Sequence, residues 1–181
     1  HEFVDGEMYA MAGGTRSHAD VQTAVVGMLF VHLQGKACRP VGSEARVYFP
    51  NYGDAAYPDA HVICGRSIRA DVDPDAVVNP TLAVEVLSPS TERWDRGGKF
   101  ERYESLPSLL EYIIVTVDRR RVEVFRREPG GPFTRYVFGE GDQVEFRSIE
   151  FRFDIAELYA LADAEALANA AAESPDSQSG G

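Results

Sequence analysis

The stretch "TLAVEVLSPST", Thr81 to Thr91, decides the fold of this chain. Its apolar residues are typical of a strand that is covered on both faces. In such a strand Glu85 shares one face with Ala83 and Leu87, while the residues between them point the other way. A carboxylate buried there loses several kcal/mol of hydration unless it gains a cation or a proton. We therefore expect Glu85 to have a specific partner.

A second glutamate in a strand-like stretch allows a simpler interpretation. In "RVEVF", Glu123 alternates with Val122 and Val124 and shares a face with Arg121. This alternation is typical of a strand with one solvated face. We expect Glu123 to be exposed, which leaves Glu85 as the glutamate that needs an explanation.

The composition indicates one globular domain without a membrane segment. The chain has 181 residues, of which 44% are hydrophobic and 26% charged, and this is enough for a sizeable core. No apolar run approaches the roughly 20 residues that cross a bilayer, so we expect a cytoplasmic protein. The two cysteines, Cys38 and Cys64, form no CxxC motif, and we expect them to be reduced packing residues.

The charge is distributed unevenly. The net charge of −11 argues against tight, non-specific binding of nucleic acid by the molecule as a whole. The segment from Arg93 to Arg127, however, contains nine basic and six acidic residues. Half of the Lys and Arg residues therefore lie in one segment directly after the Glu85 strand. A solvated helix and hairpin in this segment would by themselves account for these charges.

The order of elements predicts an α+β or mixed α/β domain. Asp5-Gly6 indicates an N-terminal hairpin, and Ser17 with Asp20 indicates the start of an amphipathic helix that stops near Gly35. The further elements are expected strands at 38–49, 60–64 and 81–87, a helix at 95–105, three antiparallel strands between residues 109 and 140, and a short terminal helix. Residues 65–80 are expected to form a polar loop. The expected domain covers residues 1–160, and residues 161–181 an acidic, mostly flexible tail.

Three charged residues follow one another in an order that suggests a mechanism. Asp59 lies where a loop enters a strand, Glu85 lies inside the next apolar strand, and Lys99 lies in the helix after it. Two carboxylates can hold Mg²⁺ through oxygen ligands and leave positions for water and phosphate. A lysine nearby can orient the water or stabilise the transition state. Acid pairs also serve as caps or salt-bridge partners, and the burial expected of Glu85 is what favours a metal site.

The sequence resembles the Uma-type restriction-endonuclease family of the PD-(D/E)XK nuclease-like superfamily. The resemblance covers residues 2–159 and is most specific in "YPDAHVI" and in "EVLSPST" followed by "DRGGKFERY". It implies a restriction-endonuclease-like fold, with a central mixed β-sheet flanked by helices, and a phosphodiesterase that uses Mg²⁺, or Mn²⁺. Asp59 matches the Asp of the PD element, and Glu85 matches the acid of the second element.

One position departs from the superfamily pattern, in which a lysine follows the acid by two residues. Here that residue is Leu87, and the lysine that resembles the family's is Lys99 on the next helix. Two further positions match the family's pattern less decisively. Glu7 of the first hairpin is either a third acid or an exposed residue, and His18 near the helix start is either a proton carrier or phosphate contact, or a solvated residue.

A third polar residue, His61, shares a strand face with Asp59, where it would support the site or serve in packing.

Three functions are compatible with these residues. The first is a Mg²⁺-dependent endonuclease that hydrolyses DNA, the second is a catalytically silent binding or assembly module with the same fold, and the third is a carboxylate-pair hydrolase for another substrate. A homodimer is expected, because the strands "YIIVTV" and "VEVF" need cover that a pairing edge could supply.

Overall fold

The structure is a computed structural model. It describes residues 15–88 and 90–172 in full, and of residues 2–4, 7–9 and 173 the backbone alone. Its centre is a six-stranded mixed sheet, which we call the central sheet, in the order β12-β11-β10-β9-β6-β3. These strands are β3 (Cys38–Gly42), β6 (Ala60–Cys64), β9 (Leu82–Leu87), β10 (Glu111–Thr116), β11 (Arg121–Arg127) and β12 (Phe133–Phe138). As predicted, β10, β11 and β12 pair antiparallel, whereas β9 and β10 run parallel.

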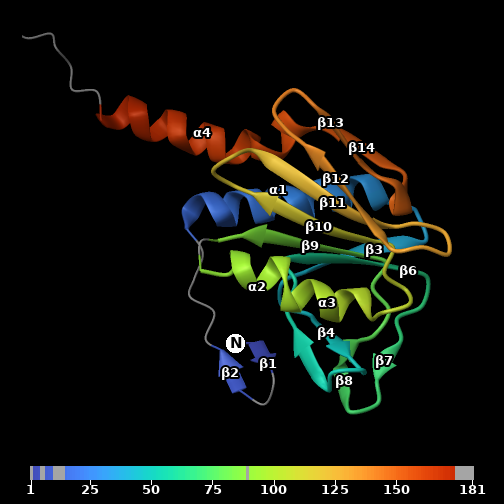
Figure 1. Cartoon of the computed structure of the whole chain (residues 1–181). Coiled ribbons are helices and arrows are strands. Elements are labelled where there is room, and N and C mark those ends of the chain that lie inside the picture. Colours follow the sequence, from blue (N-terminus) through green and yellow to red (C-terminus); the bar gives the residue numbers. More distant parts are fainter. Residues whose placement is uncertain (1, 5–6, 10–14, 89, 174–181) are drawn as a thin grey trace, which may run out of the picture.

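Helices cover both faces of the central sheet (Figure 1). One face packs against α1 (Arg16–Leu33), α4 (Ile155–Glu173) and the hairpin of β13 (Gln143–Phe146) and β14 (Phe151–Asp154). The other face packs against α3 (Gly98–Glu104), which follows α2 (Glu92–Arg96). A short 3-10 helix, Arg147–Ile149, connects β13 to β14. Because both faces are covered, β9 and β10 are buried along their whole length.

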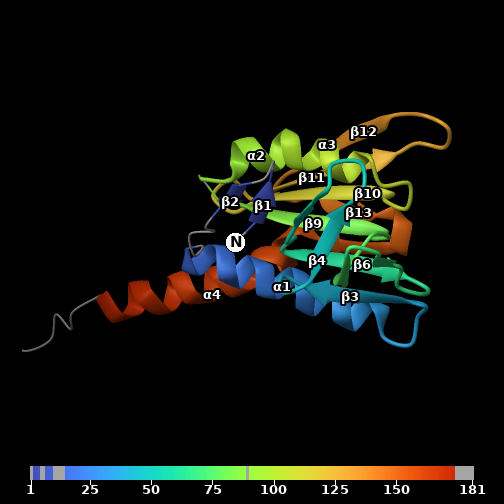
Figure 2. The same ribbon diagram turned by 90° about the horizontal axis from the view of Figure 1, so that it is seen from below.

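A second sheet closes the molecule below α3 (Figures 1 and 2). Its order is β2-β1-β5-β4-β8-β7. Its strands are β1 (Glu2–Val4), β2 (Glu7–Tyr9), β4 (Arg46–Phe49), β5 (Asp54–Ala56), β7 (Arg69–Ala70) and β8 (Asp73–Val77). Arg102 joins this sheet to α3, since its guanidinium bonds to Asp54 at 2.7 Å and contacts the rings of Tyr52 and Trp94.

Most elements expected from the sequence are present, including the antiparallel pairing of β1 with β2. The turn residues of that hairpin, Asp5 and Gly6, lie outside the described residues. The segment expected to be a polar loop contains β7 and β8 instead, because these short, polar strands have no alternation that a pattern could detect. The first helix is capped by Thr15, which accepts from the backbone N–H of His18, so the start predicted at Ser17 was wrong by two residues.

Two further expectations are corrected at the edges of the domain. Cys38 and Cys64 form a disulfide, because the antiparallel register of β3 and β6 places them directly opposite each other, so they are not reduced packing residues. The boundary expected at residue 160 falls inside α4, which packs against α1 and ends at Glu173. Every helix in the described ranges is too short or too polar to span a bilayer.

Candidate active site

Glu85 lies in the middle of the buried strand β9 and forms an ion pair with Lys99. The glutamate is 2% exposed, the lysine is 1% exposed, and Nζ of Lys99 lies 2.9 Å from Oε2 of Glu85. The prediction that a buried Glu85 requires a partner is confirmed. The two neighbours on its strand face, Ala83 and Leu87, pack with α3 and the second sheet, as the alternation predicts.

A break between α2 and α3 aims Lys99 at the sheet. The expected single helix is interrupted at Gly97, whose φ and ψ are −118° and −103°. A Cβ on Gly98 would lie 2.3 Å from the ring of Trp94, so only glycine fits at this position. The break still leaves Asp95 and Lys99 facing each other, with 3.5 Å between Oδ1 and Nζ. Asp95 is also buried, and its backbone carbonyl accepts a hydrogen bond from the hydroxyl of Tyr112.

Asp59 approaches the same region from the loop before β6. Ala60 pairs with Val84, so the antiparallel register continued by one residue places Asp59 opposite Glu85. Its Oδ2 accepts the backbone N–H of Val86 at 2.6 Å, and its Oδ1 accepts the amide of Gln22 at 3.0 Å. The side chain is 18% exposed, so solvent reaches it.

Burial raises the pKa of Asp59 above its usual value. The hydrogen bond from Val86 and the charges of His18 and Lys99 act in the opposite direction, and the charge of Asp95 adds to the rise. Two acidic side chains, those of Glu85 and Asp95, thus pair with Lys99, and Asp59 lies within reach of the charges of Lys99 and Asp95. A carboxylate in such surroundings favours the approach of a further cation.

His18 lies beside Asp59 at the N-terminus of α1. Its Nε2 is 2.8 Å from the backbone carbonyl of Val86 and 3.8 Å from Oδ2 of Asp59. Because a carbonyl only accepts, Nε2 carries the proton in this arrangement. The first turn of α1 thus brings His18 to the end of β9, next to the acid that the sequence identified.

Glu123 is not the exposed residue that the alternation suggested. It is fully buried, and it forms ion pairs with Arg96 of α2, with Arg121 and with Arg135 of β12. Burial by itself would raise the pKa of Glu123, but the hydrogen bonds and charges of Arg96 and Arg135 outweigh burial and hold that pKa below its usual range. The Arg96–Glu123 pair, at 2.8 Å, fixes α2 against β11 and so supports the position of Asp95.

The remaining predicted residues lie in different surroundings. The backbone of Glu7 is in β2, and its side chain lies outside the described residues. His61 is fully buried on the face of Ala83, and within the described part of the chain neither ring nitrogen has a hydrogen-bond partner. Burial, and then the charge of Arg39, lower the pKa of His61 to about 4. His61 is therefore a neutral core residue.

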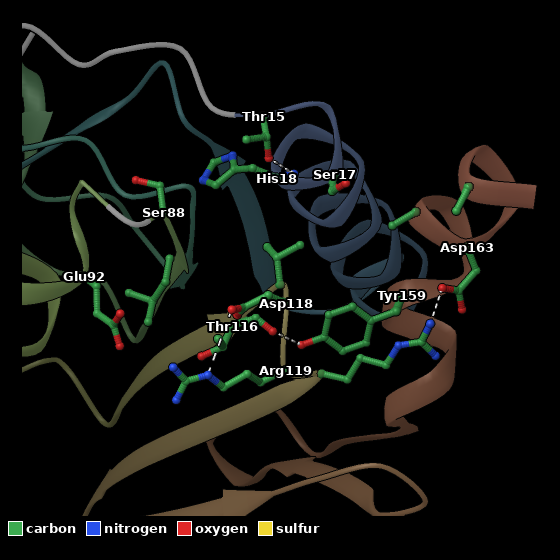
Figure 3. Close-up of a pocket in the computed structure, with 15 residues that line it drawn as sticks. Thr15, Ser17, His18, Ser88, Glu92, Thr116, Asp118, Arg119, Tyr159 and Asp163 are labelled. Carbon is green, nitrogen blue, oxygen red and sulfur yellow. Dashed lines mark hydrogen bonds and ion pairs between the residues drawn. The ribbon is translucent and has the colours of Figure 1, made fainter. Parts of the chain in front are cut away.

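Two cavities flank the pair of His18 and Asp59, one lined by His18 and the other by Asp59. The first, of about 660 Å³, includes His18 and lies between the start of α1, the ends of β9 and β10, and α4. Figure 3 shows it with Ser88, Thr116 and Tyr159 around the hollow. The second, of about 510 Å³, lies between α1 and the region of β3 and includes Asp59. An extended ligand could therefore pass the His18–Asp59 pair on both sides.

The residues present fit a hard divalent cation in the type of their donors. Carboxylate oxygens of Asp59 and Glu85 are the ligands that Mg²⁺ prefers, and solvent reaches Asp59. Among the residues that the structure describes, no three His, Cys, Asp or Glu side chains are grouped to hold a metal ion. A cation bound there would keep water or phosphate oxygens in its shell, as Mg²⁺ commonly does.

Sequence reasoning missed two residues of this site. Asp95 precedes Lys99 by four positions, a helical spacing that could have indicated their contact, and Gln22 lies four residues after His18 on the same face of α1. Neither carries a motif of its own. Their relevance comes from Asp59 and Lys99, which belong to other elements of the fold.

Comparisons with known proteins identify a family and a fold to which this chain is similar. Residues 1–156 match the family model described as "Uma2: Putative restriction endonuclease". Two uncharacterised proteins of Synechocystis sp. are similar to the chain. One is 31% identical over 159 residues, covering 88% of this chain and 83% of the relative, and the other is 28% identical over 146 residues, covering 80% and 82%. The crystal structure of a "putative nuclease belonging to DUF820" from Anabaena variabilis has the same fold, with a TM-score of 0.73, 17% identity, and coverage of 88% of this chain and 89% of that one.

Proposed function

Because the chain belongs to the Uma2 family of restriction-endonuclease-like proteins, we propose that it is a metal-dependent nuclease that hydrolyses phosphodiester bonds of DNA. The observation that carries this proposal is the buried ion pairing of Lys99 with Glu85 and Asp95, together with the charges of Lys99 and Asp95 that act on Asp59. Such a concentration of buried charge generally costs stability, and it is typical of catalytic sites.

In this proposal Asp59 and Glu85 hold Mg²⁺ or Mn²⁺. A cation bound there supplies acidified water and neutralises charge on the phosphate. Val86 and Gln22 fix both oxygens of Asp59, so this carboxylate is already oriented before substrate arrives. Lys99 orients Glu85 through their ion pair and brings positive charge to the developing phosphorane. His18 holds the end of β9 through Val86 and borders the path of the strand.

DNA as the substrate is supported by the two cavities on either side of the His18–Asp59 pair. They suit a polymer that continues past the cleaved bond in both directions. The test is cleavage of supercoiled, linear and single-stranded DNA, with RNA in parallel, in Mg²⁺, Mn²⁺ or EDTA. We expect cleavage by the wild type that is lost in Asp59→Asn and Glu85→Gln and kept in the control Asp75→Asn, whose side chain is exposed on β8. Equal cleavage by the wild type and Glu85→Gln would refute the proposal.

A second candidate, a catalytically silent module, is favoured by the Glu85–Lys99 pair itself. At 2.9 Å the ammonium already neutralises Glu85 without any metal ion. Calorimetric titration with Mn²⁺ separates the two functions. Heat that disappears in Asp59→Asn indicates a metal site, whereas the silent module predicts no heat in either protein.

The proposal of a homodimer needs a different surface from the one first expected. Strands β10 and β11 lie inside the central sheet, with neighbours on both sides, so they need no cover from a second chain. The sheet's edges are β12 and β3, and a dimer formed by strand pairing would use one of them. Light scattering of the wild type and of a Val137→Lys variant, on β12, tests this surface.

A further inference from the structure

The cavity beside Asp59 differs in character from the site that it adjoins. Its wall on α1 is formed by one helical face, and its opposite wall by the chain around β3. Its lining includes Gln22, Gly27, Phe30, Pro40 and Asp59. Among the described residues that form the lining, Asp59 is the one with a charge, and none is Lys or Arg. The cavity suits an uncharged, flat group better than a phosphate.

An aromatic ring stands at one end of this cavity. Phe30 is 57% exposed, which is unusual for a ring on a helix whose other face forms the core. A Cβ on Gly27, one turn before it, would meet nothing within 4 Å, so the helix surface beside the ring is open. Phe30 follows Gln22 by eight residues, or about 12 Å along the helix. That length corresponds to roughly three to four stacked nucleotides.

We propose that the groove between α1 and β3 binds an unpaired nucleobase of the substrate strand, which stacks on Phe30. This inference rests on the proposed function, because Asp59 at the other end of the groove is taken as the site of cleavage. Bases stack on exposed aromatic rings with little regard to sequence. Paired bases hide their faces, so the groove selects single-stranded or locally opened nucleic acid.

The experiment measures binding in EDTA, so that it does not depend on cleavage. The probes are a fluorescent twelve-residue oligothymidine, the same oligonucleotide without its bases, and a blunt duplex of twelve base pairs, each measured by anisotropy. We expect Phe30→Ala to weaken oligothymidine binding by about 5- to 100-fold and Phe30→Trp to retain it. The abasic oligonucleotide and the duplex are expected to bind the wild type and Phe30→Ala equally.

Val31 provides a matched control. It is the next residue of α1 and is 69% exposed, yet it does not line the groove, so Val31→Ala is expected to bind oligothymidine like the wild type. Unchanged binding by Phe30→Ala would overturn the proposal, and so would an equal loss for the abasic probe. A changed oligomeric state of Phe30→Ala in light scattering, with normal binding, would identify the ring as a protein contact. Binding that depends on Phe30 in a protein that does not cleave would refute the nuclease and leave the base site.

Discussion

Replacing Lys99 by methionine removes the cation that the buried acids of the site share. The ammonium is 1% exposed and lies 2.9 Å from Glu85 and 3.5 Å from Asp95. Removing one partner of a buried ion pair costs about 3–5 kcal/mol, because the other charge stays buried without compensation. For a chain of this size, an m-value of about 2–3 kcal/mol/M in urea converts this loss into a midpoint lower by about 1–2.5 M.

The assay is urea unfolding followed by circular dichroism, with the same measurement on four variants: Lys99→Met, Glu85→Leu, the double variant of both, and Lys36→Met. Lys36→Met is the matched control, since it removes the other lysine of the chain from an exposed position, and we expect a change within about 0.5 kcal/mol. The double variant Glu85→Leu, Lys99→Met removes both charges of the pair, and we expect it to be more stable than Lys99→Met alone. An unchanged midpoint for Lys99→Met would refute the reasoning, as would a double variant that loses the sum of both single losses.

Three further predictions concern residues around the site. Because burial raises the pKa of Asp59, its charged form costs stability that is recovered as the pH falls. We therefore expect Asp59→Asn, which should also abolish cleavage, to have a urea midpoint equal to or higher than that of the wild type at pH 8, and we expect this difference to vanish near pH 4. A lower midpoint for the variant at pH 8 would contradict this. The pKa of His61 is lowered to about 4, so as the pH falls the unfolded chain takes up this proton before the folded chain does, and the free energy of unfolding should fall by up to about 3 kcal/mol between pH 6.5 and 4. Urea melts of His61→Leu across this range should show a weaker dependence of stability on pH. The same dependence as in the wild type would exclude His61 as the cause. Gly98→Ala should lower the free energy of unfolding by more than about 1 kcal/mol, because its Cβ would collide with Trp94. Gly27→Ala, on the open face of α1, should raise that free energy by about 0.5–1 kcal/mol. Equal melting temperatures of these two variants would show that the helix break is not fixed by Trp94.

The sequence by itself determined the features that depend on local periodicity. Alternating residues around Glu85 predicted a strand buried on both faces, and helical spacing predicted α1, because side-chain direction repeats every two residues in a strand and every 3.6 in a helix. The need of Glu85 for a partner also followed from elementary solvation, and Lys99 meets it. The family, which covers residues 1–156, was recognisable from the same stretches.

Tertiary structure alone decided which charges meet. Glu123 has an ordinary strand pattern, yet Arg96 and Arg135 reach it from α2 and β12, so it is buried rather than solvated. Cys38 and Cys64 are 26 residues apart, and the register of two strands joined them. Such contacts depend on how distant elements align, and a local pattern carries no information about alignment. The sequence likewise predicted Asp59 and Glu85 as acids of a site, whereas only the packing of α2 and α1 showed that Asp95 contacts Lys99 and that Gln22 contacts Asp59.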